Sequence, residues 1–196
     1  MLLDVKDLRV TFRSTGKEAV HGISLCLDEG ERLGLVGESG SGKTVTAMAI
    51  SGLIERSNVD MSGSVTFDGK DLMSYSRDEL RTIQGKDIGV VFQEPMTSLN
   101  PLMRIGAQVE ETLMIHTGMS PGDRKKAALQ ALEEVGIHDP ETTYAKYPHQ
   151  LSGGQRQRVM IASAMIIHPK LVICDEPTTA LDVSVQAQIL ELLRRM

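Results

Sequence analysis

Apolar and polar residues alternate over the first third of the chain. This two-residue period runs through LLDVKDLRVTF (2–12) and HGISLCLDEGE (21–31), which predicts half-buried β-strands. A shorter apolar run, ERLGLVG (31–37), predicts a strand that ends in a glycine-rich turn. SVTFDGKDL (64–72) contains an Asp-Gly pair, which is typical of a hairpin turn.

Between about residues 94 and 163 the apolar period lengthens to that of a helix. The spacing predicts helices over 105–116 and 127–135, with Gly136 as a stop. On either side of this region, DIGVVFQ (87–93) and KLVICDEP (170–177) are short apolar runs that predict buried strands. Strand, glycine-rich turn, helix and a later strand ending in acids predict an α/β fold with a mostly parallel sheet.

Composition excludes several classes of protein. With 196 residues, 41% of them hydrophobic and 24% charged, the chain has the size and composition of one globular domain. A net charge of −5 and the lack of a basic block argue against a nucleic-acid partner. The longest apolar stretch, near 159–167, is about half of a membrane span, so membrane association has to come through a partner. Two widely separated cysteines and no leader sequence at Met1 favour a cytosolic compartment.

A phosphate-binding loop is the strongest chemical signal. GESGSGKT (37–44) matches the pattern G-x-x-x-x-G-K-[ST] between a predicted strand and a predicted helix, TVTAMAISGLI (44–54). Glycines allow the backbone N–H groups to point at phosphate oxygens, and the helix start adds partial positive charge. Lys43 can reach the β/γ-phosphates and the Thr44 hydroxyl can ligate Mg²⁺. The candidate ATP-binding residues are Gly37, Glu38, Ser39, Gly40, Ser41, Gly42, Lys43 and Thr44.

The strand LVICDE (171–176) delivers two carboxylates at its end, where ligands bind in open α/β sheets. Asp175 suits Mg²⁺, directly or through water, and Glu176 suits a residue that orients or deprotonates the attacking water. The candidate catalytic residues are therefore Glu176 and Lys43.

A second glycine-rich helix start, LSGGQ (151–155), precedes QRQRVMIASAMII (155–167). Its N–H groups offer another anion site, formed by Ser152, Gly153, Gly154 and Gln155. One nucleotide does not need two such sites, so this one is expected to face an ATP held by another subunit. A plain glycine start to a helix remains the alternative for LSGGQ taken alone.

In this order and spacing, GESGSGKT, LSGGQ, LVICDE and ALD (180–182) resemble the ABC-type ATPases over essentially the whole chain. The resemblance implies a P-loop core with an N-terminal antiparallel β subdomain and an inserted helical subdomain. It further implies that Gln93 links Mg²⁺ and water to the transporter interface and takes part in catalysis. Asp182 is implied to touch the opposite subunit, and Phe12, 25 residues before Gly37, to stack on adenine.

FQEPMTSLNP (92–101), YPHQLSGG (147–154) and DEPTTALDVSVQAQIL (175–190) further resemble the branch that imports dipeptides, oligopeptides or nickel. The implied cofactors are ATP and Mg²⁺. The implied partners are a second ABC ATPase subunit, identical or homologous, in an ATP sandwich dimer, together with permease subunits and a separate substrate-binding protein. The chain is then expected at the cytoplasmic face of the membrane as a peripheral protein. Within one domain, 1–94 and 166–196 are expected to form the nucleotide-binding core and 95–165 the helical subdomain.

The end of the chain departs from the family pattern. The family carries a γ-phosphate histidine about thirty residues beyond the catalytic glutamate, but the sequence ends twenty residues beyond Glu176. The apolar spacing of Ile189, Leu190, Leu193 and Met196 also predicts a helix that needs cover. We therefore expect an incomplete domain that binds ATP, hydrolyses it poorly and exposes apolar surface near its end.

Three alternatives stay open on the sequence. The first alternative is a P-loop kinase or GTPase, and both LSGGQ and the presence of Glu176 beside Asp175 argue against it. A soluble ABC ATPase not coupled to transport usually carries long insertions or two cassettes. A regulatory, non-catalytic ABC subunit tends to lose the Glu or the Lys, and both are present here. The sequence does not specify the transported substrate, because the permease and a separate binding protein select it.

Overall fold

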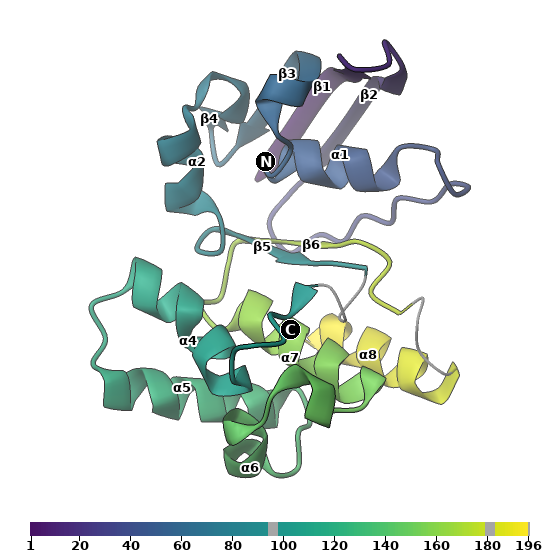
Figure 1. The fold of residues 1–196 in the computed structure, drawn as a ribbon. Helices are drawn as coiled ribbons and strands as arrows, with labels where there is room; N and C mark the ends of the chain where they lie inside the picture. The colour runs from purple at the N-terminus through teal and green to yellow at the C-terminus, as the bar shows by residue number, and fades with distance from the viewer. Residues whose placement is uncertain (94–97, 179–182, 196) are drawn as a thin grey trace. The chain divides into compact units, whose positions relative to one another are not determined.

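In the computed structural model, residues 1–93, 98–178 and 183–195 are described, and the chain divides into two compact units. Unit 1 is Met1–Gln84 and unit 2 is Gly85–Met196. Figure 1 labels the strands and α-helices of both units. None of the helices within the described ranges is long and apolar enough to cross a membrane.

Unit 1 is built on an antiparallel sheet with strand order β2-β1-β3-β4. Its strands are β1 (Leu3–Phe12), β2 (Glu18–Leu27), β3 (Val59–Phe67) and β4 (Lys70–Asp71). The two predicted strands are confirmed as β1 and β2. On β1, Val5, Leu8 and Val10 are fully or almost fully buried, and the three-residue step from Val5 to Leu8 coincides with a shift in the pairing with β2. The helices are α1 (Lys43–Ile50) and α2 (Arg77–Ile83), with 3₁₀ turns at Arg56–Asn58 and Leu72–Ser74.

The predicted hairpin turn is confirmed at Asp68 and Gly69. Both residues have positive φ, 48° and 75°, as a type I′ turn requires. The strands it joins pair antiparallel, Phe67 with Lys70 and Thr66 with Asp71. The Asp-Gly pair thus fixes the register of the β3–β4 edge.

The strand predicted over 31–37 is wrong. These residues form no strand, and Leu33, Leu35 and Val36 are 54%, 50% and 94% exposed. A strand forms only where a neighbour supplies ladder hydrogen bonds, and none of the strand pairs in the described residues includes this segment. Apolar composition alone could not reveal that missing neighbour.

Unit 2 contains two parallel strands, β5 (Ile88–Val91) and β6 (Leu171–Cys174), and a group of helices. Both strands were predicted, and Figure 1 shows them side by side. The helices are α4 (Ile105–His116), α5 (Pro121–Glu134), α6 (Pro140–Ala145), α7 (Gly153–Met165) and α8 (Val183–Arg195), with a 3₁₀ turn at Pro148–Gln150. Ile105, Val109, Leu132, Val159 and Ile161 are completely buried in their common core.

The helix predicted over 105–116 coincides with α4, and the one predicted over 127–135 lies within a longer helix, α5. α5 begins earlier because the Ser120 hydroxyl accepts the Asp123 N–H at 3.2 Å and Pro121 occupies the first helical position. Gly136 follows its end with φ 81°, which confirms the predicted stop.

The apolar face predicted for the last helix is partly confirmed in α8. Ile189 is completely buried in the helical core, and Leu193 packs against that core. Leu190, expected to need cover, is 46% exposed. Met196 lies outside the described residues.

Candidate nucleotide site

The glycine-rich turn before α1 is closed by its own lysine. Gly40 and Gly42 have φ of 80° and 96°, which a side chain would disfavour. Between them the chain turns back, since Ser41 N donates to Glu38 O at 3.2 Å. Lys43 Nζ donates to the carbonyls of Gly37 at 2.8 Å and Glu38 at 3.0 Å. The ammonium group is therefore held on the loop itself.

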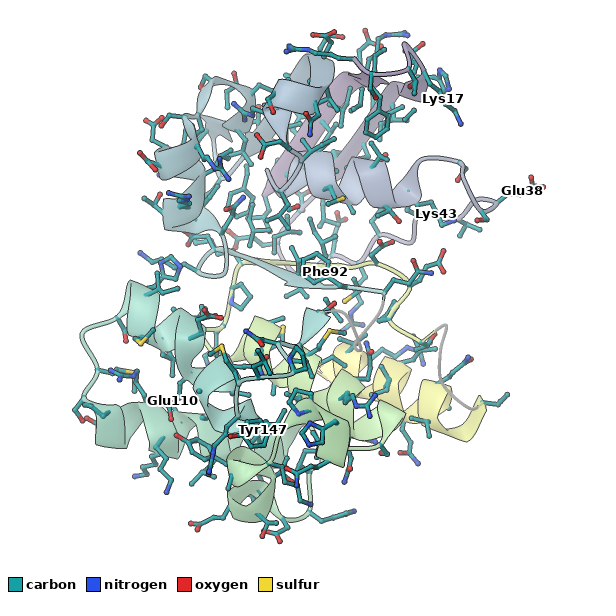
Figure 2. All side chains as sticks on the ribbon, in the orientation of Figure 1. Lys17, Glu38, Lys43, Phe92, Glu110 and Tyr147 are labelled. Atoms are coloured by element: carbon teal, nitrogen blue, oxygen red, sulfur yellow. The ribbon has the colours of Figure 1, made fainter. Side chains whose placement is uncertain are left out.

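Gly42 anchors the start of α1 to the sheet. A Cβ built there would lie 2.3 Å from the carbonyl oxygen of Ala19 on β2, so only glycine permits this contact. As the N-cap, Gly42 makes no side-chain hydrogen bond to the first turn. The first N–H groups of α1 thus have no side-chain cap and are suited to an anion. Thr44, exposed in that first turn, adds a hydroxyl. Figure 2 labels Lys43 at this helix start.

Phe12 ends β1 at the tip of the β1–β2 hairpin and is half-buried. Its N–H donates to Lys17 O at 3.0 Å and its carbonyl accepts the Gly16 N–H at 2.8 Å, which closes the tip. The strand that leaves this tip, β2, continues to Ala19, the residue in contact with Gly42. Phe12 and the phosphate loop therefore belong to one unit and are connected through β2.

The two strands of unit 2 bring Gln93 and Glu176 together. Gln93 Nε2 donates to Glu176 Oε2 at 3.0 Å, although the residues are 83 positions apart. Asp175 is fixed by its backbone, since its N–H donates to Val91 O at 2.9 Å. Glu176 has φ 44°, a conformation uncommon for a residue with a side chain and often found at functional sites.

The LSGGQ helix start is capped by its own side chains. Ser152 Oγ accepts the Gln155 N–H at 3.3 Å, and Gln155 Oε1 accepts the Ser152 N–H at 3.0 Å. This reciprocal arrangement is a capping box. Ser152 and Gly153 are nevertheless exposed, while a Cβ at Gly154 would lie 3.1 Å from Val185 Cγ1 of α8.

The segment that leads into this helix is ordered by ring contacts. The Tyr147 and His149 ring centroids lie 5.7 Å apart in a stacked arrangement, and the Arg104 guanidinium lies 5.7 Å from the Tyr147 ring centroid. Figure 2 labels Tyr147. Arg156 Nε donates to Pro148 O at 2.8 Å and ties α7 to the same segment. These contacts fix the segment that leads to Ser152.

The predicted site residues are thus divided between the units. Gly37–Thr44 and Phe12 lie in unit 1, whereas Gln93, Asp175, Glu176 and Ser152–Gln155 lie in unit 2. Asp182 lies outside the described residues. Sequence reasoning did not anticipate the bond between Gln93 and Glu176. The available signal was that both residues stand near the end of a short apolar run predicted to be a strand.

Thr44, Gln93 and Asp175 offer a hydroxyl, an amide and a carboxylate oxygen, which are the hard donors that Mg²⁺ prefers. Within the described ranges no three His, Cys, Asp or Glu side chains form a metal-binding group. Thr44 belongs to unit 1 and Gln93 and Asp175 to unit 2, and each of these oxygens by itself is of the type found around a magnesium ion that phosphates and water also hold.

Residues 20–179 match the family described as ABC transporter. The chain belongs to this family. It is 51% identical over 196 residues to the oligopeptide transport ATP-binding protein OppD of Bacillus subtilis, covering 98% of this chain and 55% of that protein. It is 48% identical to OppD of Salmonella typhimurium, covering 100% of this chain and 59% of the relative. The ABC chain therefore spans a little over half the length of these curated relatives.

A solved ABC structure has the same fold. The ATP-binding cassette MJ0796, in a dimeric post-hydrolysis state bound to ADP and Pi, superposes with a TM-score of 0.86 at 33% identity. The match covers 98% of this chain and 81% of that one. The expected fold class, a P-loop NTPase core with an antiparallel β subdomain and a helical subdomain, is thereby confirmed.

Proposed function

We propose that this chain binds and hydrolyses ATP and powers an ABC importer of peptides. The observation that carries the proposal is the uncapped start of α1, where a glycine loop, Lys43 and Thr44 present donors for a polyphosphate. The OppD relatives are named for oligopeptide transport, which favours peptides over nickel as the cargo.

In the proposed site, the loop Gly37–Thr44 binds the phosphates through backbone N–H groups, and Lys43 leaves its carbonyl partners to bind the β/γ-phosphates. Phe12 stacks on the adenine. Thr44, Gln93 and Asp175 hold Mg²⁺, which when bound offsets charge on the phosphate oxygens. Glu176 accepts the proton of the attacking water, because its carboxylate lies at the carboxyl end of the β5–β6 pair.

The second subunit completes the site in this proposal. Each ATP lies between Gly37–Thr44 of one chain and Ser152–Gln155 of the other, with Asp182 touching the opposite subunit. The exposure of Ser152 and Gly153 supports this role, since a partner can reach them. The dimeric state of the MJ0796 cassette supports it as well.

The remaining assignments follow from the same proposal. Residues 1–94 and 166–196 form the nucleotide-binding core, and 95–165 transmit its motion to permease subunits that receive cargo from a separate binding protein. The chain is then peripheral at the cytoplasmic face of the membrane and has no nucleic-acid partner. The alternative is a soluble ABC-type ATPase that is not coupled to transport.

Isothermal titration of MgATP tests the nucleotide site. Lys43→Ala removes the main countercharge of a polyanion and should reduce ATP affinity at least tenfold. Lys70→Ala, on exposed β4, is the matched control because it removes the same charge elsewhere in unit 1. Unchanged affinity in the Lys43 variant would show that the nucleotide binds elsewhere.

Co-purification tests the transport assignment. The chain, expressed together with the permease subunits of a peptide importer, should be retained on membranes, and it should be released when those subunits are omitted. ATP binding without any permease retention would favour the soluble alternative.

A further inference from the structure

The register of the two strands in unit 2 places Gln93 beside Glu176. β5 and β6 run parallel, and their last pair is Val91 with Cys174. The bond from Asp175 N to Val91 O extends the ladder by one step. Gln93 stands two positions after Val91, and Glu176 stands two positions after Cys174. Equal numbers of residues beyond the two parallel strands therefore bring both side chains to the same edge of the sheet. Their contact is a consequence of the fold rather than of surface side chains meeting by chance.

The chemistry of the pair determines how the amide points. A carboxylate accepts hydrogen bonds and does not donate them, so the group that faces Glu176 is the NH₂ end of the Gln93 amide. The amide oxygen, Oε1, is then directed away from this bond and stays able to accept from water or to ligate a cation. One side chain can therefore hold Glu176 through its nitrogen and a second group through its oxygen.

The backbone conformation of Glu176 indicates what the contact with Gln93 does. With φ 44°, Glu176 occupies a conformation that costs energy for any residue with a Cβ, and the surroundings must hold it there. The hydrogen bond from Gln93 joins the end of that side chain to the strand next to it. A side chain held at both its backbone and its carboxylate has a defined position, which an exposed glutamate otherwise lacks.

We infer that Gln93 is a positioning residue for Glu176, which it holds through its amide N–H. This inference rests on the proposed function, in which Glu176 receives a proton from water. The amide nitrogen fixes where the accepting carboxylate lies before hydrolysis begins, and the amide oxygen performs any metal contact independently. Loss of the nitrogen should impair hydrolysis even where an oxygen is kept at position 93.

Exchanging the two side-chain types isolates the hydrogen bond. Gln93→Glu keeps the length and an oxygen but places two carboxylates about 3 Å apart, where like charges repel. Adding Glu176→Gln restores an amide facing a carboxylate with donor and acceptor exchanged. In the nucleotide-free protein we expect Gln93→Glu to lower Tm by about 3 °C or more. The double variant should return to within about 1 °C of the parent, a compensation typical of residues in contact.

The chain offers a matched control on α5. Gln130 Nε2 donates to Glu134 Oε1 at 2.8 Å, the same pair of groups on an exposed helix in the same unit. Gln130→Glu creates the same carboxylate contact there and should leave nucleotide hydrolysis unchanged. If added negative charge alone impaired the protein, Gln93→Glu and Gln130→Glu would lower hydrolysis to a similar extent.

Phosphate release then connects the bond to catalysis. Gln93→Glu should lower kcat about tenfold or more while the ATP half-saturation changes less than about twofold. In the Glu176→Gln background the same substitution should cause no further loss, because the residue being positioned no longer accepts a proton. The exchanged double variant should melt like the parent yet remain inactive.

Two results would overturn the inference. One is an unchanged Tm and kcat in Gln93→Glu, which would mean that position 93 acts only through its oxygen. The other is a double variant that melts no higher than Gln93→Glu. If the parent protein fails to bind ATP, the proposed function fails, but the melting series still decides whether the two side chains are coupled.

Discussion

Two helices, α1 and α7, begin with glycine-rich turns, but they differ in whether side chains cap their first N–H groups. At α1 the N-cap is Gly42, with φ 96° and no side-chain cap, and Lys43 is bound by loop carbonyls. At α7 the N-cap is Ser152, with φ −67°, and a capping box with Gln155 provides partners for the Ser152 and Gln155 N–H groups. The first turn of α1 therefore has no side-chain cap, whereas that of α7 has one.

This difference assigns unequal roles to two similar sequences. An uncapped helix start has N–H groups whose best available partner is a ligand, so α1 can bind phosphate within a single chain. At α7 a phosphate competes with the Ser152–Gln155 box and gains less. We therefore propose that α7 is the weaker half of a site that binds only when another chain already holds the nucleotide.

The largest expected effect is at Gly42. Gly42→Ala forces an alanine to φ 96° and sets its Cβ 2.3 Å from Ala19 O, a backbone atom that cannot move without shifting β2. We expect a loss of about 3 kcal/mol or more, seen as a fall in Tm of about 6 °C or more, and loss of ATP binding. Gly30→Ala is the control, since φ is 77° and nothing lies within 4 Å. Equal melting of the two variants would refute the anchoring of α1 on β2.

Ser152→Arg comes next and tests the division of roles. A long cation at the exposed N-cap should block a second chain, while ATP binding by the single chain should change less than about twofold because α1 is untouched. Sedimentation in MgATP, in a Glu176→Gln background that keeps ATP uncleaved, should show the dimer lost. A Ser152→Arg protein that still dimerises would contradict a site shared between two chains.

Local patterns that depend on nearby residues were predictable from the sequence. Asp68-Gly69 gave the hairpin turn, because both positions need positive φ. The apolar period gave α4 with both ends, and Gly136 marked where α5 stops. The acids after β6 were found because they stand at the end of an apolar strand, where ligands bind in open α/β sheets. In each case the determining contact lies within a few residues along the chain.

What depends on distant partners was not predictable. The run 31–37 is apolar enough for a strand, but no pattern within it states whether a neighbouring strand pairs with it. The contact between Gln93 and Glu176 required the register of β5 with β6. The state of α7 also went unseen, since LSGGQ was interpreted as open N–H groups while Ser152 and Gln155 cap each other.

A smaller effect is expected from removing the cap of α7. Ser152→Ala abolishes the bond to Gln155 N and should lower stability by about 1 kcal/mol, or Tm by about 3 °C. Ser120→Ala on α5 is the control, because Ser120 accepts the Asp123 N–H in the same way. The Ser152–Gln155 capping box and a bound phosphate would compete for the same N–H groups. If they do, Ser152→Ala should lower the free energy of dimer dissociation in MgATP by less than it lowers the free energy of unfolding. Dimerisation that falls as completely as in Ser152→Arg would instead make the hydroxyl itself a required ligand.

The smallest change in stability is expected at Gly154. This position tests why the turn at the start of α7 is glycine-rich. Gly154 lies at the second helical position, where Gly154→Ala gains helix propensity but brings a Cβ to 3.1 Å from Val185 Cγ1. These terms oppose, so we expect a net change within about 0.5 kcal/mol. Gly122→Ala is the control at the second position of α5, where the nearest atom is Ser120 Oγ at 3.9 Å.

If Gly154 serves the approach of a nucleotide from a second chain, Gly154→Ala should melt like Gly122→Ala and yet weaken the MgATP dimer several-fold, because a methyl group then stands beside the helix start. Sedimentation and melting on the same two proteins separate these effects. A Gly154→Ala protein that dimerises as the parent does would mean that the glycine serves only the packing of α7 against α8. The resemblance between the two glycine-rich turns would then be one of sequence and not of function.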